Sequence, residues 1–264
     1  MKRIHYTALL ATLSWLTGCA TQIQEPITSE AVAYHEASKL KWQEVFFDAF
    51  TEDWQTQWTL DGEVATAINT PAGIELTAGP ERIDGHHMVL WTKDTFEGDV
   101  KIEYEFTRMD TSEVGVNILY IQATGSGQGP YQTDISKWAD LRREPAMRLY
   151  YDYMHTYHIS YAVSTPDTGY VRARRYMPHA TGLKGTALKP DYFPKGLFAS
   201  GVPHKITVIK KDRELLMKCE NAEQTIYCQM KNPDLPIIRE GRIGLRLMWT
   251  RAARIKNFRI SQIK

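Results

Sequence analysis

The chain has 264 residues, of which 43% are hydrophobic, so it is long enough to bury the core of one large domain. Its 32 Lys and Arg residues balance 31 Asp and Glu residues. This balance argues against a general nucleic-acid role, because such proteins usually carry a marked basic excess. Aromatic residues are abundant, with 14 Tyr and 7 Trp. Such side chains suit strand faces and also the C–H faces of sugars.

The first 18 residues have the pattern of a secretory signal. Lys2 and Arg3 precede an apolar run, ending at Leu16, that is too short to cross a bilayer. The tetrapeptide Leu16-Thr17-Gly18-Cys19 resembles the bacterial lipoprotein box, in which the cysteine is lipidated and the chain is cut just before it. We therefore expect a signal peptide at 1–18 and a lipid on Cys19 as the sole attachment to a membrane. The expected location is the cell envelope, at the outer membrane facing the periplasm or the surface. The alternative is an ordinary signal peptide with an incidental cysteine.

Residues 19–44 are predicted to form a lipid-anchored tether with a helical stretch near 31–41, and residues 45–264 to form one domain. Alternating and β-branched runs predict strands at 45–48, 58–60, 73–77, 88–91, 100–106, 115–123, 157–161, 170–176, 204–210, 241–249 and 254–260. The run 115–123 is apolar on both faces, which predicts a central strand. A Gly-rich loop and a short helix near 135–149 interrupt the strands. Many short strands with little helix predict an all-β antiparallel jelly-roll sandwich.

Two cysteines remain in the predicted domain. Cys219 and Cys228 lie on the two arms of a predicted hairpin whose turn is formed by residues 221–223. An oxidising compartment favours a disulfide between them, provided that the strand register lets the Cβ atoms meet. Two free thiols are the alternative.

Several segments follow one another in a recognisable order along the predicted domain. They are His87-Met-Val-Leu-Trp91, Val100-Lys-Ile-Glu-Tyr-Glu-Phe106, Tyr157-His-Ile-Ser-Tyr161, Gly241-Arg-Ile-Gly-Leu-Arg246 and Ile255-Lys-Asn-Phe258. This set resembles a bacterial family of concanavalin-like sandwich proteins long labelled as of unknown function. The resemblance spans most of residues 45–262. It implies a concanavalin or laminin-G-like jelly roll and an association with enzymes that degrade uronic-acid polysaccharides such as pectin or ulvan.

Residues 150–176 concentrate the side chains that β-elimination on a uronate requires. Arg neutralises the carboxylate, and His and Tyr commonly serve as base and acid. Period-two geometry places Arg172, Arg174 and Tyr176 on one face of a strand. If the preceding strand is its neighbour, His158 shares that open, polar face, although a one-residue slip in register would reverse the assignment.

The first hypothesis is therefore β-elimination by a polysaccharide lyase or an oligosaccharide dehydratase. His158 would be the base, Tyr161 or Tyr176 the acid, and Arg174 the group that neutralises the carboxylate. The candidate substrate-binding residues are Arg172, His87, Trp91, Asn117, Gln122 and Arg246. The second hypothesis is a non-catalytic glycan-binding lipoprotein that uses the same face. Both imply an acidic poly- or oligosaccharide partner and no cofactor, with a structural calcium left open.

Glycoside hydrolysis is the third alternative, and it needs two suitably spaced carboxylates. Glu103 and Glu105 share a strand face but alternate with apolar residues, as on an ordinary solvent-facing strand. The adjacent His86 and His87 point in opposite directions on a strand, which makes a poor metal site. The sequence therefore favours elimination or binding over hydrolysis.

Overall fold

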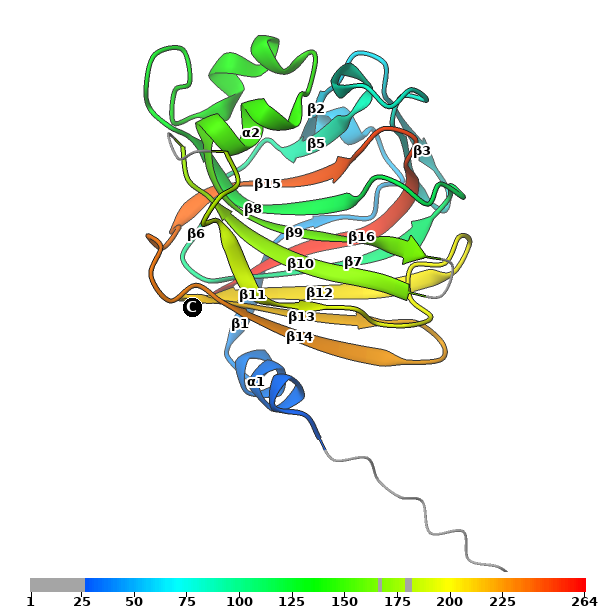
Figure 1. The fold of residues 1–264 in the computed structure, drawn as a ribbon, viewed down its shortest axis with the longest axis vertical. Helices are drawn as coiled ribbons and strands as arrows, with labels where there is room; N and C mark the ends of the chain where they lie inside the picture. Colours follow the sequence, from blue (N-terminus) through cyan, green and yellow to red (C-terminus); the bar gives the residue numbers. More distant parts are fainter. Residues whose placement is uncertain (1–26, 166–167, 179–181) are drawn as a thin grey trace, which may run out of the picture.

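Two antiparallel sheets stacked face to face form the fold in the computed structural model, which describes residues 27–165, 168–178 and 182–264 (Figure 1). In spatial order, the strands of sheet 1 are β2 (Trp58–Asp61), β5 (Met88–Thr92), β15 (Glu240–Leu247), β8 (Asn117–Gly125), β9 (Met154–Thr165) and β10 (Thr168–Tyr176). The strands of sheet 2 are β14 (Thr225–Lys231), β13 (Glu214–Glu220), β12 (Pro203–Lys211), β7 (Val100–Arg108), β16 (Ala252–Ile263), β4 (Gly73–Thr77) and β3 (Thr66–Thr70). The predicted all-β sandwich is confirmed.

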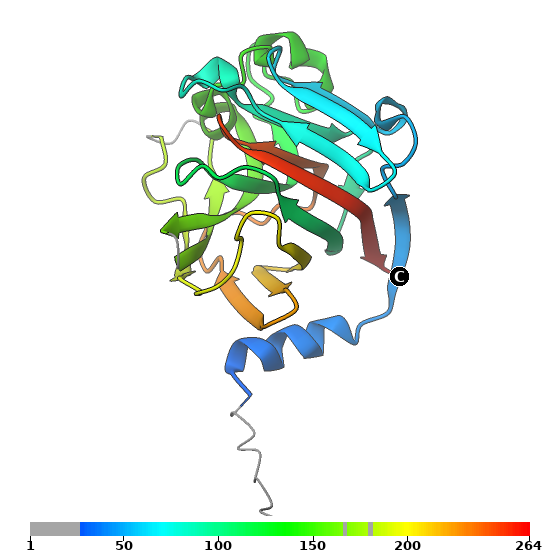
Figure 2. The ribbon, with the colours of Figure 1, turned by 90° about the vertical axis from the view of Figure 1, so that its right-hand side faces the viewer.

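Three further strands complete the two layers. β11 (Ala187–Tyr192) pairs with β10 on one side and with β14 on the other, so it joins the edges of the two sheets. β6 (Phe96–Glu97) pairs with β15. β1 (Trp42–Asp48) pairs with β16, and Figure 2 shows it beside that C-terminal strand. Strand β16 therefore has partners along both edges.

Side chains from the facing surfaces of the two sheets meet in one apolar core. Strand β7 buries every second residue, as its alternating sequence requires. Strand β8 is buried on both faces, which confirms the predicted central strand. Its inward residues Leu119 and Ile121 join the core, whereas Ile118 and Tyr120 join a second apolar cluster on the outer face of sheet 1. Sheet 1 is therefore covered on both sides.

Two helical segments cover the outer face of sheet 1. They are the 3₁₀ segment η3 (Ile135–Arg142) and α2 (Met147–Tyr153), in the region where the sequence predicts a short helix. Trp138 from η3 and Tyr150 from α2 are buried in the outer cluster. Two shorter 3₁₀ turns, η1 (Trp54–Thr56) and η2 (Asp84–His86), lie in connections between strands. The cover on sheet 1 is what positions the site described below.

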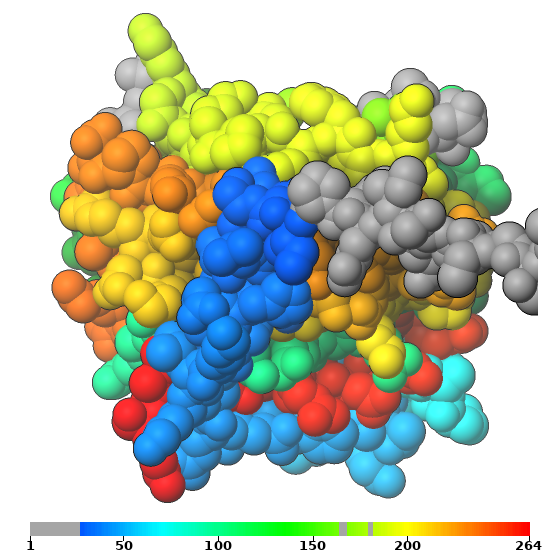
Figure 3. Space-filling view, turned by 90° about the horizontal axis from the view of Figure 1, so that it is seen from below, coloured from blue at the N-terminus to red at the C-terminus, as the bar shows by residue number. Residues whose placement is uncertain are grey.

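Helix α1 (Ser29–Ser38) lies across the outer face of sheet 2 (Figure 3). The hydroxyl of Thr28 caps the helix by accepting from the Ala31 N–H at 3.2 Å. Tyr34 and Ala37 pack against apolar side chains of β12 and β13. The helical stretch in the predicted tether is thus present, but it is folded against the domain rather than extended from it. The predicted signal peptide and Cys19 lie outside the described residues.

Within the described ranges, the longest apolar helical stretches fall short of what is needed to cross a bilayer.

Candidate functional site

The pairing of β9 with β10 sets the faces of the predicted site residues. Arg174 lies opposite His158 and Arg172 lies opposite Ser160, while Ile159 and Ala173 face the core. The structure therefore confirms that His158, Arg172, Arg174 and Tyr176 share one face, the outer face of sheet 1, as the period-two pattern predicts. The prediction that this face is open was wrong, because η3 and α2 cover it and bury His158 and Tyr176.

His158 and Tyr176 are in direct contact. The His158 Nδ1 atom and the Tyr176 hydroxyl oxygen are 2.5 Å apart, and the side chains are almost fully buried. Burial, followed by the positive charge of Arg174, holds the pKa of His158 well below its usual value. Burial also raises the pKa of Tyr176 well above its usual value. The pair is therefore a neutral imidazole bonded to a neutral phenol.

Arg246 and His87 meet beside this pair, because β15 and β5 are neighbours in sheet 1. The Arg246 Nη2 atom donates to His87 Nδ1 and, at 2.6 Å, to the carbonyl oxygen of Pro145. Its guanidinium lies 4.5 Å from the centroid of the Tyr150 ring. Burial and the Arg246 charge lower the pKa of His87 to about 3. A guanidinium can only donate, so Nδ1 of the neutral His87 accepts and the ring proton sits on Nε2.

His87, Tyr120, His158, Tyr176 and Arg246 form what we call the outer-face cluster. Tyr120 packs against one half of the cluster, since its ring centroid lies 5.9 Å from that of His158 and 5.9 Å from that of Tyr176. It also stacks on Tyr150, the ring that the Arg246 guanidinium covers.

Several buried polar atoms of the outer-face cluster have no hydrogen-bond partner among the described residues. They are His87 Nε2, Tyr120 Oη, His158 Nε2, Arg246 Nε and Arg246 Nη1. A buried polar group without a partner is costly, so such atoms call for an explanation. Three of the five, namely Nε2 of His87 and the two Arg246 nitrogens, can only donate. These buried donors therefore need a hydrogen-bond acceptor or an anion that the described residues do not supply.

A buried carboxylate holds the cover of the site in place. Asp61, at the end of β2, accepts from Arg142 Nε at 2.6 Å, Trp91 Nε1 at 2.7 Å and the Tyr150 hydroxyl at 2.9 Å. Trp91 and Tyr150 stack with Tyr120, with interplanar angles of 2° to 16°. Asp61 thus ties η3, α2 and β5 into one wall beside the cluster.

Neither Asp61 nor Arg142 stands out in the sequence as a site residue. Eighty-one positions separate them, and no motif marks the pair. Trp91, predicted to bind substrate, is instead a buried part of this wall. Its ring faces other rings rather than an open surface.

Arg172 and Arg174 form the partly exposed rim of the site. Arg172 Nε donates to Asp191 at 2.9 Å, yet 36% of the Arg172 side chain remains exposed. Arg174 makes only long contacts, including 3.3 Å to the Thr186 hydroxyl. The rim therefore offers positive charge beside the buried outer-face cluster, close enough that both arginines add to the effect of burial in lowering the pKa of His158.

Three predicted site residues lie elsewhere. Tyr161 faces the core, where its hydroxyl is 3.0 Å from that of Tyr104, so it cannot serve as the acid partner of His158. The predicted alternative, Tyr176, lies on the same face as His158 and contacts it. Asn117 also points away from the site and donates to the Tyr161 carbonyl at 3.4 Å. Gln122 sits at positive φ in an irregularity between β8 and β15. Its amide donates to the carbonyls of Phe96 and Gly98, so its role is structural.

The predicted disulfide is not formed. Cys219 and Cys228 are both buried and free. The hairpin itself is present, but Cys219 lies opposite Ile226 and Cys228 lies opposite Met217. This register offsets the cysteines by two positions, so they pack in the core as small apolar side chains.

The carboxylates considered for hydrolysis are on the other sheet. Glu103 and Glu105 lie on the outer face of β7 in sheet 2, and each forms an ion pair with a lysine. Neither approaches the outer-face cluster.

Among the described residues, no three or more His, Cys, Asp and Glu side chains are grouped so as to hold a metal ion.

The fold is an antiparallel β-sandwich, and its solved structural neighbours include galectin-like and legume lectin-like folds. Residues 47–260 match the family described as domain of unknown function DUF1961, and the chain belongs to that family. A comparison with curated proteins finds no significant match.

Solved structures of the same fold have dissimilar sequences. A protein of unknown function with a galectin-like fold from Bacillus subtilis is 15% identical, with a TM-score of 0.62, and the match covers 84% of this chain and 100% of that one. The carbohydrate recognition domain of Emp46p in its metal-free form is 14% identical, with a TM-score of 0.53, over 84% and 98% of the two chains. A legume lectin-like domain from Entamoeba histolytica is 8% identical, with a TM-score of 0.52, over 80% and 92%. At such low identity these likenesses establish the fold alone.

Proposed function

We propose that this protein binds an acidic saccharide on the outer face of sheet 1. The observation that carries the proposal is the set of buried donors of His87 and Arg246 that lack acceptors among the described residues. A carboxylate supplies several acceptor sites and a compensating charge, and charge-assisted hydrogen bonds to arginine are among the stronger ones in proteins. Arg172 and Arg174 at the rim add positive charge that would attract such a ligand.

The saccharide class rests on two further points. One solved structure of the same fold is the carbohydrate recognition domain of Emp46p, which supports a sugar as the ligand. A uronic-acid residue combines the carboxylate and the sugar ring in one molecule, and the family resemblance points to glycans of that kind.

A titration tests binding. We expect a uronate oligosaccharide to bind, and Arg174→Gln to weaken its affinity about 10-fold through loss of a charge-assisted contact. Arg254→Gln is the matched control, because Arg254 lies on sheet 2 and pairs with Glu75. Equal effects of the two substitutions, or no binding of any uronate oligosaccharide, would overturn the proposal.

A second candidate function, β-elimination on the bound uronate, is favoured by the 2.5 Å contact between His158 and Tyr176. In the tautomer suited to a base, Nδ1–H of His158 donates to the Tyr176 oxygen and the lone pair is on Nε2. The depressed pKa of His158 keeps that lone pair free of a proton at neutral pH. Arg174, opposite His158, would neutralise the carboxylate of the substrate.

The proposed step balances as follows. The C5–H bond breaks and its proton goes to Nε2 of His158, while the C5 electron pair forms a C4=C5 double bond. The C4–O bond breaks, and the leaving oxygen takes the proton of the Tyr176 hydroxyl. The Nδ1 proton of His158 then passes to the Tyr176 oxygen across their hydrogen bond, which restores the phenol and leaves a neutral His158 with its proton on Nε2. Loss of that proton to solvent and uptake of another at Nδ1 return His158 to the starting tautomer. If the leaving oxygen belongs to a sugar, the reaction is that of a lyase; if it is a hydroxyl group, the reaction is a dehydration.

Ultraviolet absorbance of the unsaturated product distinguishes elimination from binding alone. If the protein is an enzyme, His158→Gln and Tyr176→Phe should each lower the rate about 100-fold or more, the scale of general acid–base catalysis. Tyr161→Phe is the matched control, because Tyr161 lies on the core side of the same strand. Binding without any rise in absorbance would leave a binding protein, and activity that survives His158→Gln would exclude His158 as the base.

We also propose that the domain is held at the cell envelope by a lipid on Cys19, as its tetrapeptide suggests. Metabolic labelling with a fatty-acid analogue should mark the full-length chain and fail to mark Cys19→Ser. Equal labelling of both chains would refute the anchor.

A further inference from the structure

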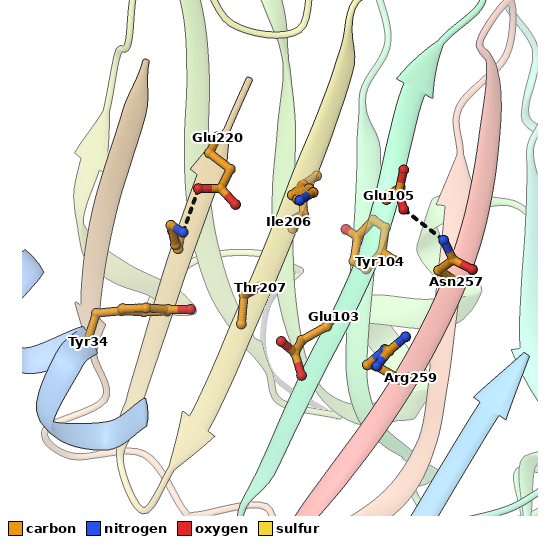
Figure 4. A pocket seen from close by; sticks show the side chains of 11 residues that line it. Tyr34, Glu103, Tyr104, Glu105, Ile206, Thr207, Glu220, Asn257 and Arg259 are labelled. Carbon is orange, nitrogen blue, oxygen red and sulfur yellow. Dashed lines mark hydrogen bonds and ion pairs between the residues drawn. The ribbon is translucent and has the colours of Figure 1, made fainter. Parts of the chain in front are cut away.

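The outer face of sheet 2 carries a groove of about 360 Å³ (Figure 4). Its floor is formed by outward side chains of β13, β12, β7 and β16, and Tyr34 of α1 closes one end. Figure 4 shows Tyr34 reaching from the helix toward Thr207. The volume falls at the lower end of the range of about 300–1,000 Å³ that is common for small-molecule sites. The groove is therefore large enough for a short ligand.

The charges of the groove are balanced by the strand register. Lys205 lies between Glu220 and Glu105 on the neighbouring strands, and Thr207 lies between Lys218 and Glu103. The lining holds three acidic residues (Glu103, Glu105 and Glu220) and three basic ones (Lys205, Lys218 and Arg259), so its net formal charge is zero. Neither a polyanion nor a polycation gains from such a surface.

The ion pairs of the groove leave hydrogen-bonding capacity unused. Lys218 pairs with Glu220 at 2.5 Å and Lys101 pairs with Glu103 at 2.9 Å, in each case along a single strand. Lys205 forms no ion pair within 4 Å of a described carboxylate, although its charge helps to lower the pKa of Glu105. That carboxyl is partly desolvated, but the hydrogen bond from Asn257 and the nearby lysines favour its ionised form. Strong acceptors and a donor ammonium thus lie side by side.

We infer that this groove binds a short neutral saccharide. Each sugar hydroxyl both donates and accepts, so it can satisfy the carboxylates and the lysine ammonium groups without bringing in charge. The phenol ring of Tyr34 offers an apolar edge at the closed end. The inference does not depend on the acidic-saccharide site, because the two surfaces lie on opposite sheets and differ in charge.

A titration with short neutral oligosaccharides of glucose, mannose, galactose and xylose tests the inference. We expect at least one to bind and Thr207→Trp, which fills the floor of the groove, to weaken it about 10-fold or more. Thr59→Trp is the matched control, since Thr59 is an exposed strand residue of β2 in sheet 1. Glu103→Gln, a milder change that removes one charged acceptor, should weaken binding about 10-fold.

Outcomes at the two sites are separable. If the inference holds, Arg174→Gln leaves neutral-saccharide binding unchanged, and Thr207→Trp leaves uronate binding unchanged. The inference is overturned if no neutral oligosaccharide binds, if Thr59→Trp and Thr207→Trp act equally, or if Glu103→Gln has no effect. Loss of neutral-saccharide binding in Arg174→Gln would place both ligands in the single site on sheet 1.

Discussion

The outer faces of the two sheets have opposite character, although both arise from the same period-two alternation. On sheet 1, η3 and α2 cover the strands and bury His87, His158 and Arg246. On sheet 2, α1 covers only part of the surface, and the rest is an open ladder of alternating charges. The three carboxylates of the ladder, Glu103, Glu105 and Glu220, each form an ion pair with a lysine of the same sheet. On the covered face, buried donors of His87 and Arg246 have no acceptor among the described residues. The covered face is therefore the stronger candidate for a ligand-binding or catalytic site.

The largest expected effect comes from breaking the cover of sheet 1. In Asp61→Ala, Arg142 loses its carboxylate while both side chains of the native pair are only 2% exposed. Removing one partner of a buried ion pair costs about 3–5 kcal/mol of unfolding free energy. Urea denaturation of the purified protein measures this loss.

A neighbouring pair provides the control. Glu63 and Arg143 also join the segment after β2 to the end of η3, but their side chains are 50% and 69% exposed. Glu63→Ala should therefore cost about 0–1 kcal/mol. Similar losses in Asp61→Ala and Glu63→Ala would mean that burial does not set the cost of breaking an ion pair in the cover of sheet 1.

Acid sensitivity should be the next largest difference. The unfolded histidine has a pKa of about 6.5, whereas that of folded His87 is about 3. As pH falls below about 6.5, His87 binds a proton in the unfolded chain but not in the folded one. The free energy of unfolding therefore falls by about 1.4 kcal/mol per pH unit because of this group. Between pH 6.5 and pH 5 the loss is about 2 kcal/mol.

Urea denaturation of His87→Asn at about pH 7 and pH 5 checks this. From pH 7 to pH 5, the free energy of unfolding of the variant should fall by about 2 kcal/mol less than that of the parent. His86→Asn, at the partly exposed preceding position, should keep the full acid sensitivity. An unchanged pH response in His87→Asn would show that folding does not lower the pKa of His87.

The sequence determined more of the fold than of the site. Alternation in β7, β9 and β10 was enough to predict a sandwich and to place His158, Arg174 and Tyr176 on one face, because a strand has only two faces. The insertion of residues 124–148 decides which face of the sandwich is covered. Its sequence has no periodicity from which its packing could be predicted. The Asp61–Arg142 pair was missed for that reason.

Two predictions, Tyr161 as the acid and the Cys219–Cys228 disulfide, were wrong because of strand alternation and register. Tyr161 was chosen by residue type, but it is three positions from His158 and so lies on the opposite face. The disulfide required Cys219 and Cys228 to be directly opposite, and the three-residue turn that was predicted did not fix the register closely enough to test this.

The smallest expected effect lies on the open face. Glu220→Gln removes the partner of Lys218, but their side chains are 30% and 24% exposed and Lys205 and Lys218 can still interact with water. The pair should therefore contribute about 0–1 kcal/mol to the unfolding free energy, and added salt should shrink that contribution further. Urea denaturation at low and high salt measures both quantities. A loss comparable to that of Asp61→Ala would mean that the charged ladder on sheet 2 is as desolvated as the buried side chains on sheet 1. The two outer faces would then not differ in solvation.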